Sequence, residues 1–392
     1  MKNELVVLDL NQTWSVVDCP PGVKPIDCSW VYQIKRRPDG SVERYKARLV
    51  AKGFTQKEGV NFLETFSPVV KPATIRLVLA LTSMKRWPIH QLDVNNAFLH
   101  GDLSEEVYMT LPPRISSSHP NQCCKLLKSL YSLCQSSRMW YKKLSKLLIS
   151  CGYQQTLSDY SLFVKIIDAE VSVLLVYVDD IILTGNSIFE MVTIKSILNQ
   201  HFKIKDLDTL KYFLSIEVAH FAQEISLSQR KYCVDLLENS SLLGAKPASV
   251  PMDSSTKLHQ DNSPLLSDPL IYRRLVGRLL YLTTMWPDIT YATQQLSQYM
   301  ASPTESHFRV ANWVLRYLKS NPGRGLFFSR DSFVHICEFS NSNWAGCPDT
   351  CRSLTGYCFF LEKSLISWKT KKQSTIARSS TEAEYRALAN TT

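Results

Sequence analysis

The sequence predicts an α+β fold with prominent antiparallel hairpins and more than one domain. Short strand patterns joined by tight turns alternate with helical patterns, without the regular β-α-β order of a doubly wound sheet. With 392 residues, 45% of them hydrophobic, the chain can bury two or three cores. Residues 239–270 are rich in Ser, Pro and Asp, so we expect a linker there.

The first predicted element pair is a β-hairpin over residues 29–53. Its first strand alternates apolar and polar residues, and Pro38-Asp39-Gly40 supplies the turn. The return strand carries three cations at even spacing: Lys46, Arg48 and Lys52. Even spacing places these side chains on one face of a strand. Such a face suits a triphosphate or is simply solvated, and the spacing alone leaves both open.

A helix is predicted to begin at Pro72 and to end near Arg86, because Ile75, Val78 and Leu79 recur at helical spacing. The next segment reads as a strand with Asp93 at its carboxyl end. A lone Asp before Asn-Asn is usually a helix cap. It would also be the third carboxylate of a two-cation site if a later strand returned beside it.

The segment from Val171 to Gly185 predicts a second hairpin, with Asp179 and Asp180 at its bend between two apolar, β-branched runs. Most such pairs are solvated turns. Here no Gly, Asn or Pro flanks the acids, and the neighbouring strands consist of apolar residues that favour burial. Buried, adjacent carboxylates need compensation, which a divalent cation with oxygen ligands supplies. A metal site is therefore favoured.

Further helices and strands follow from periodicity. Trp140, Leu144, Leu147 and Leu148 indicate a helix whose outer face carries Lys142, Lys143 and Lys146. The other predicted helices are Ile188–Phe202, Tyr272–Met300, Ser306–Ser320 and a last one that starts at the capping signal Ser380-Thr381-Glu382. The other predicted strands are Ser161–Ile167, Tyr212–Val218, Ile225–Leu227, Val334–Phe339, Gly356–Leu361 and Ser364–Trp368.

The formal charge of +10 is concentrated in two acid-free runs. One lies between Asn121 and Ser150, and the other holds Lys363, Lys369, Lys371, Lys372 and Arg378. Aromatic residues among the cations suit a polyanion, although a solvated lysine-rich surface explains the charge equally well. The eleven cysteines show no metal-ligand spacing, so we expect free thiols. Without a signal peptide or a long apolar run, we expect a soluble, intracellular protein that does not contact a membrane.

Several blocks together resemble the reverse transcriptase–RNase H region of Ty1/copia LTR retrotransposon Pol polyproteins. The likeness spans nearly the whole chain. The blocks are Glu43–Gly53, Glu64–Val69, Gln91–Leu103, Tyr177–Asp180, Pro287–Ala292, Trp344–Cys347 and Ser379–Leu388. A single Tyr-x-Asp-Asp is a weak signal, whereas this many blocks in this order are specific.

The resemblance implies a right-hand polymerase of fingers, palm and thumb, followed by a truncated RNase H-like α/β module. The expected limits are 1–220 for fingers and palm, 221–255 for a thumb-like segment and linker, 256–330 for a helical connection, and 331–392 for the RNase H-like part. The implied activity is RNA-directed DNA polymerisation with two Mg²⁺ ions, Mn²⁺ being the alternative. Its partners are an RNA or DNA template with primer, and dNTPs.

The resemblance also assigns roles by position. Asp93, Asp179 and Asp180 correspond to the catalytic, metal-binding carboxylates. Phe98 matches the ring that excludes a 2′-hydroxyl, while Lys46, Arg48, Lys52 and Gln135 lie in dNTP-binding blocks. Tyr177 and the helix lysines Lys142, Lys143 and Lys146 would track template and primer.

This chain also departs from the family pattern. Ser132 and Ser215 replace glycines, Cys134 a lysine, Ser137 a proline, and Asn95 stands where lysine is usual. In the RNase H-like part the expected metal-binding acid is Asn341, Asn343 is also an amide, and of Glu382 and Glu384 the latter aligns better with the catalytic glutamate. A neutral amide bridges metal ions poorly, so we expect no RNase H activity.

Three functions remain to be compared. The first is a reverse transcriptase, located in the cytoplasm, where an intact element forms a virus-like particle, or in the nucleus. The second is a decayed element remnant that folds and binds nucleic acid without catalysis. The third, an unrelated two-metal phosphodiesterase, is disfavoured by the fingers block and the position of Phe98.

Overall fold

The computed structural model divides the chain into two compact units. It describes residues 1–37, 39–113, 115, 119, 121–253, 256, 258–260, 263–331 and 333–391. One unit combines Met1–Lys71 with Pro88–Thr209, and the other combines Pro72–Trp87 with Leu210–Thr392. All eleven cysteines are free thiols, as the sequence predicted. In the described part of the chain, no helix is long and apolar enough to cross a membrane.

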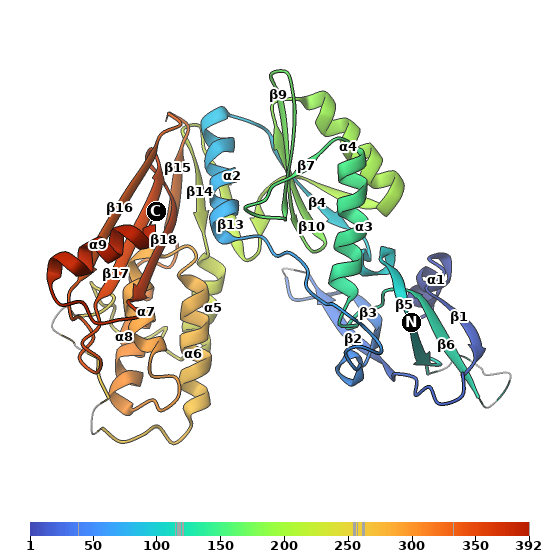
Figure 1. Cartoon of the computed structure of the whole chain (residues 1–392), viewed down its shortest axis with the longest axis horizontal. Helices are drawn as coiled ribbons and strands as arrows, with labels where there is room; N and C mark the ends of the chain where they lie inside the picture. Colours follow the sequence, from blue (N-terminus) through green and yellow to red (C-terminus); the bar gives the residue numbers. More distant parts are fainter. Residues whose placement is uncertain are drawn as a thin grey trace. The chain divides into compact units, whose positions relative to one another are not determined.

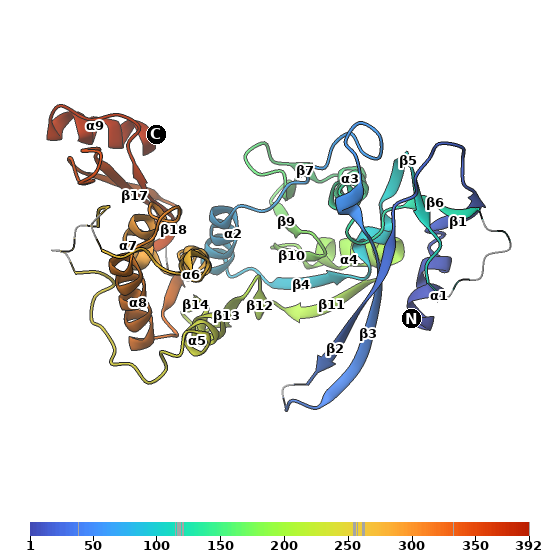
Figure 2. The same cartoon turned by 90° about the horizontal axis from the view of Figure 1, so that it is seen from below.

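The first unit is organised around a six-stranded sheet with the order β11-β4-β10-β9-β8-β7. Its strands are β4 (Ile89–Val94), β7 (Gln154–Gln155), β8 (Leu162–Ile167), β9 (Glu170–Tyr177), β10 (Asp180–Gly185) and β11 (Ile204–Thr209). Figure 2 shows β4 running between β10 and β11. The hairpin predicted around Asp179 and the strand predicted to end near Asp93 are thus confirmed, and they are direct neighbours.

Two helices cover one face of this sheet. They are α3 (Ser136–Ser150) and α4 (Ile188–Phe202), and both can be followed beside the sheet in Figure 1. Trp140 of α3 and Phe202 of α4 meet with ring centroids 4.9 Å apart. They join a buried cluster that includes Leu92 and Val94 of β4 and Ile181 and Leu183 of β10. Because strand side chains alternate, the residues between these leucines and valines face away from the helices.

The rest of the first unit has a second core. The three-stranded sheet β1-β6-β5 consists of β1 (Trp14–Asp18), β5 (Asp102–Thr110) and β6 (Gln122–Lys128). Helix α1 (Lys2–Leu10) and the short 3-10 helices η1 (Gly53–Thr55) and η2 (Ala97–His100) complete this part. Leu8, Leu49, Leu99 and Met109 are fully buried here, so this cluster ties the N-terminal helix to the strands.

The predicted N-terminal hairpin consists of β2 (Cys28–Arg36) and β3 (Val42–Ala51). Pro38 of its predicted turn lies outside the described residues. Lys46 and Arg48 share a face of β3, as expected. Lys52 does not, because β3 ends at Ala51 and the chain turns into η1, where Lys52 forms an ion pair with Asp27 at 3.3 Å.

The second unit contains helix α2 (Pro72–Lys85), although this helix lies in the middle of the first unit's sequence. The predicted apolar face of α2 is buried. Arg76 is also buried: it donates hydrogen bonds to the backbone oxygens of Ile366 and Thr284 and stacks on Trp368, 4.0 Å from the ring centroid. Burial lowers the pKa of Arg76 to about 10.

Two sheets and a group of helices form the remainder of this unit. The four-stranded sheet contains β12 (Tyr212–Phe213), β13 (Ile216–His220), β14 (Glu224–Ser228) and β15 (Gly325–Ser329). The helices are α5 (Arg230–Asn239), α6 (Pro269–Leu282), η3 (Pro287–Ile289), α7 (Thr290–Ser297) and α8 (Glu305–Ser320). Between α5 and α6 the described residues form neither helix nor strand, and this segment lies inside the second unit and not between the two units.

The prediction of one continuous helix over Tyr272–Met300 was wrong, because the chain forms α6, η3 and α7 there. The chain leaves the helix after Leu282, because Pro287 has no N–H to continue the bonding pattern and restricts the residue before it. Trp286 accordingly lies outside the helical region, with φ −121° and ψ 83°.

The last sheet contains β16 (Ile336–Asn343), β17 (Leu354–Leu361) and β18 (Ser364–Lys372), in that order. Helix α9 (Ser380–Thr391) follows them. The cap is Ser379 and not Ser380: its hydroxyl accepts a hydrogen bond from the backbone N–H of Glu382 at 3.1 Å.

Candidate active site

The two most informative acids face each other across neighbouring strands. Asp93 of β4 is the register partner of Asp180 of β10, at the end of the sheet where the β9–β10 hairpin turns. Both side chains alternate with residues of the helix-covered core, so they project from the other face of the sheet. Gln91 lies on that face too, and its amide donates a hydrogen bond to Asp180 at 3.1 Å.

The turn that carries Asp179 has a strained backbone, and two hydrogen bonds from neighbouring elements hold it. Val178 has φ +52°, which is rare for a β-branched residue. Its carbonyl accepts a hydrogen bond of 2.6 Å from the indole N–H of Trp140, and the carbonyl of Asp179 accepts one of 2.8 Å from the N–H of Val94. Helix α3 and strand β4 therefore fix the bend, and the side chain of Asp179 stays beside the Asp93–Asp180 pair.

For Asp93 and Asp180, burial and the neighbouring carboxylates outweigh the compensation that nearby groups of the chain supply. Burial raises the pKa of the Asp93 carboxyl, and the charge of Asp179 raises it further. Burial likewise raises the pKa of Asp180, and Asp179 and Asp93 add to the effect against the hydrogen bond from Gln91. Hard divalent cations prefer such oxygen ligands, so the donor set fits Mg²⁺.

The three carboxylates are spread more widely than a single-ion cage. Within the described residues, the group whose ligand atoms all lie within 4.8 Å of one another is His90, Asp206 and Asp208, not Asp93, Asp179 and Asp180. The wider spacing is compatible with a pair of ions about 3.5–4 Å apart and with rotation of the side chains on binding.

Sequence reasoning missed the group of His90, Asp206 and Asp208. The Lys195 ammonium lies within it, 3.0 Å from Nδ1 of His90 and 2.7 Å from Asp206. Burial lowers the pKa of His90, and the charge of Lys195 lowers it further. Burial acts to raise the pKa of Asp206, but the hydrogen bond from Lys195 lowers it, and the net shift is downward. Because an ammonium already supplies the positive charge, we interpret this group as a structural ion-pair network.

A cation and two aromatic rings line up next to the acids. The Arg48 guanidinium lies over the ring of Tyr131, 4.6 Å from its centroid, and Tyr131 meets Phe98 edge-on at 5.5 Å. The hydroxyl of Tyr131 donates to Oδ1 of Asn96 at 3.2 Å. The charges of Lys46 and Arg48 both lower the pKa of Asp93, against the larger effect of burial.

Other predicted contacts have protein partners. Gln135 is fully buried: it accepts a hydrogen bond from Gln56 and donates one to the carbonyl of Asn61, each at 3.0 Å. It thus anchors the loop after β3. Lys143 pairs with Asp102, whereas Lys142 and Lys146 extend exposed from α3. Tyr177 is half-buried at the end of β9, opposite Asp180.

The two serines that stand where the resemblance expects glycine both have a left-handed backbone. Ser132 has φ +69° and Ser215 has φ +61°. Glycine adopts this region without the steric cost that a Cβ brings. Gly53 packs against this segment, and a Cβ on Gly53 would lie 1.9 Å from the carbonyl oxygen of Ser132.

In the second unit, the two glutamates of the expected RNase H positions have different partners. Glu384 reaches β16, where it accepts a hydrogen bond from the N–H of Ser342 at 3.1 Å. Glu382 instead accepts from the N–H of Arg378 at 2.7 Å and pairs with Arg386 at 2.6 Å. Asn341 lies exposed on β16, next to Ser342.

Comparisons with known proteins identify the family of this chain. The family described as reverse transcriptase (RNA-dependent DNA polymerase) matches residues 11–254. The chain is 45% identical, over 97% of its length, to the Retrovirus-related Pol polyprotein from transposon RE1 of Arabidopsis thaliana, and it covers 26% of that protein. It is 36% identical, over its whole length, to the Retrovirus-related Pol polyprotein from transposon TNT 1-94 of Nicotiana tabacum, of which it covers 30%. The chain therefore belongs to the reverse transcriptase (RNA-dependent DNA polymerase) family, as it occurs in the Pol polyproteins of Ty1/copia-type retrotransposons.

Proposed function

We propose that this chain is an RNA-directed DNA polymerase that transfers nucleotides from dNTPs to a primer 3′-hydroxyl. The observation that carries the proposal is the Asp93–Asp180 cross-strand pair beside Asp179, on the sheet face opposite the helices. Two Mg²⁺ ions bound there would activate the 3′-hydroxyl and neutralise the leaving pyrophosphate, with Mn²⁺ as the alternative. The three carboxylates would hold the ions, and the hydrogen bond from Trp140 to Val178 would keep the turn that carries Asp179 in place.

The nucleotide is proposed to lie between these acids and β3. Arg48 and Lys46, whose charges lower the pKa of Asp93, would contact the triphosphate, with Lys52 at the strand end. Phe98, whose ring packs edge-on against Tyr131, would exclude a 2′-hydroxyl. Gln135 is proposed to act indirectly, because its amide already holds the loop that carries Gln56 and Asn61.

The template and primer are proposed to follow α3, through Lys142, Lys143, Lys146 and Tyr177. We retain 1–220 as fingers and palm, 221–255 as thumb-like segment and linker, 256–330 as connection and 331–392 as an RNase H-like part, with α2 contributed to the second unit. We place the protein inside the cell, in the cytoplasm or nucleus.

Extension of a DNA primer on poly(rA) with Mg²⁺ tests the polymerase proposal. The wild type should extend the primer, and Asp179→Asn/Asp180→Asn should not. Asp206→Asn is the matched control, because it removes a carboxylate from the Lys195 network and should retain extension. Extension that persists in the double variant would refute the assignment.

A decayed remnant that binds nucleic acid without catalysis is the second candidate. It is favoured by the left-handed serines Ser132 and Ser215, and by Asn341 at the expected metal position. Primer binding without extension by the wild type would support it. We also propose that the RNase H-like part is inactive, so EDTA-sensitive cleavage of a labelled RNA–DNA hybrid would contradict us.

A further inference from the structure

A cavity of about 710 Å³ lies between three helices of the second unit, α5, α6 and α8. Helix α8 packs against both α5 and α6, and the three helices can be followed in Figure 1. The volume lies within the range of ligand sites, roughly 300–1,000 Å³. Asp93, Asp179 and Asp180 belong to the other unit, so this cavity has no part in the proposed polymerase site.

The floor of the α5–α6–α8 cavity is apolar. Each helix contributes one large apolar side chain: Leu236 from α5, Leu275 from α6 and Phe308 from α8. The two leucines are buried and Phe308 is half-buried. Ile271 of α6 also lines the cavity, and 47% of its surface is exposed. The apolar floor therefore continues into surface that water covers, and a partner that covers it gains free energy.

Two arginines stand at the edge of this floor. Arg274 and Arg278 are one turn apart on α6, a spacing that places their Cβ atoms roughly 5–6 Å from each other. Nε of Arg274 donates to the carbonyl of Leu270 at 3.3 Å, and the guanidinium of Arg278 lies 5.8 Å from the ring centroid of Tyr232.

Neither arginine has a carboxylate partner in the part of the chain that the structure describes. Among the lining residues, all of which the structure describes, there is no Asp or Glu. The remaining wall is neutral: Asn239, Ser240 and Ser241 follow the end of α5, and Asn312 lies on α8. The cavity thus combines an apolar floor with two positive charges that the chain itself does not neutralise.

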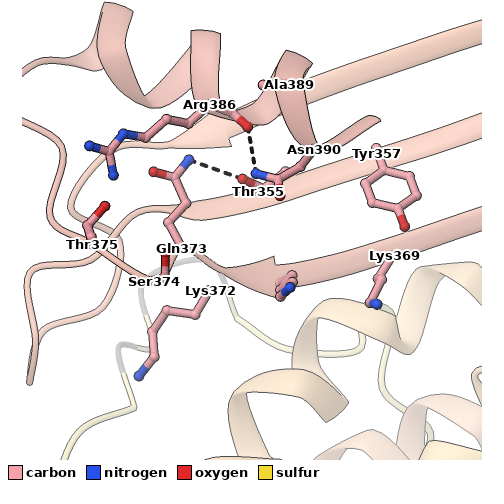
Figure 3. A pocket seen from close by; sticks show the side chains of 11 residues that line it. Thr355, Tyr357, Lys369, Lys372, Gln373, Ser374, Thr375, Arg386, Ala389 and Asn390 are labelled. Atoms are coloured by element: carbon pink, nitrogen blue, oxygen red, sulfur yellow. Dashed lines mark hydrogen bonds between the residues drawn. The ribbon is translucent and has the colours of Figure 1, made fainter. Parts of the chain in front are cut away.

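The cavity beside α9 in the same unit has a different character. Figure 3 shows its lining side chains, and all of them except Ala389 are polar or charged. Such a wall suits a solvated ligand. By contrast, a ligand of the α5–α6–α8 cavity has to be apolar on one side and negatively charged beside it.

We propose that the α5–α6–α8 cavity is a docking site for an amphipathic helix of a protein partner, with two acidic side chains one turn apart beside an apolar stripe. The apolar stripe would cover Ile271 and Phe308, as helices do in hydrophobic grooves. Acids at positions i and i+4 have the spacing of the two arginines, and carboxylates accept paired hydrogen bonds from guanidinium groups. A polynucleotide backbone would satisfy the charges but leave the apolar floor uncovered, so the observations favour a protein helix.

Fluorescence anisotropy of a labelled peptide with the full chain tests the proposal. The probe is a helical peptide of about 18 residues, with leucines at spacings of three and four and two glutamates one turn apart beside them. A matched peptide carries glutamine in place of both glutamates. The glutamate peptide should bind about tenfold more tightly than the glutamine peptide. Equal affinities, or no binding of either peptide, would overturn the proposal.

Variants of α6 locate the binding site. Arg274→Gln/Arg278→Gln should weaken binding of the glutamate peptide about tenfold. Lys231→Gln/Lys246→Gln removes the same charge from the same unit, outside the cavity lining, and should leave the affinity unchanged. An equal loss in both pairs would refute a defined site.

A charge exchange separates recognition from a merely structural effect. Arg274→Glu/Arg278→Glu should lose the glutamate peptide and bind a peptide that carries lysine in place of both glutamates. If this variant binds neither peptide while its helix content and Tm equal those of the wild type, the pairing is wrong.

Two further measurements separate this proposal from nucleic-acid binding and from the polymerase proposal. Single-stranded DNA with the same number of charges as the glutamate peptide should not displace it. Displacement that depends on Arg274 and Arg278 would assign the cavity to a polynucleotide and overturn the protein partner. Asp179→Asn/Asp180→Asn should bind the peptide as the wild type does, so the two proposals can fail separately.

Discussion

Replacing Asp180 with Asn should stabilise the metal-free protein, although it removes an expected catalytic group. Asp180 and Asp93 are like charges directly opposite each other on antiparallel strands. Such a cross-strand pair is worth roughly 0.2–1 kcal/mol of destabilisation. Asn keeps an oxygen that can accept the hydrogen bond from Gln91. The gain corresponds to a rise in Tm of about 1–3 °C for a unit of this size.

The gain should depend on pH in a defined direction. The pKa of Asp180 is raised above its ordinary value of 3.8, so the folded state holds the proton more tightly than the unfolded state does. The metal-free wild type therefore loses stability as pH rises from about 3.8 through the raised pKa. The advantage of Asp180→Asn should be full at neutral pH and absent at lower pH, where both acids are protonated.

Thermal unfolding in EDTA and in Mg²⁺ measures both effects, with hydrogen exchange over β4 and β10 as the local probe. Mg²⁺ should stabilise the wild type more than the variant, since the ion binds the folded state. Asp206→Asn is the control with the opposite sign, because it breaks the 2.7 Å pair with Lys195 and should lower Tm without changing the Mg²⁺ response. A lower Tm for Asp180→Asn in EDTA would refute the reasoning.

Three further predictions concern backbone strain and individual hydrogen bonds. Ser132→Gly and Ser215→Gly should each raise the urea concentration at the midpoint of unfolding. The strain of a left-handed backbone, about 1–3 kcal/mol, outweighs the conformational entropy that Gly loses on folding, about 0.5–1 kcal/mol. Unchanged midpoints would contradict this. Trp140→Phe removes the hydrogen bond to Val178 and should lower the kcat of primer extension more than it changes KM. Arg76→Met should destabilise the second unit by about 1–3 kcal/mol for each carbonyl left unpaired, seen as faster proteolysis of residues 72–87.

Local periodicity determined much of what was predicted. The alternation around Asp179 identified the hairpin, and the helical spacing of Trp140 and Leu144 identified α3. These patterns report which face of an element is apolar, so they also placed Asp93 at a strand end. They failed where one residue overrides a pattern, as Pro287 does in the predicted long helix and as the end of β3 does before Lys52.

The sequence by itself determined the element types, the acidic residues and the family blocks, because these depend on neighbours along the chain. Only the tertiary structure decided that β4 lies between β10 and β11, which sets Asp93 opposite Asp180 and brings His90, Asp206 and Lys195 together. It also decided that Gln135 is buried and that α2 belongs to the second unit. Strand order and burial arise from contacts between residues far apart in sequence, which no local pattern encodes.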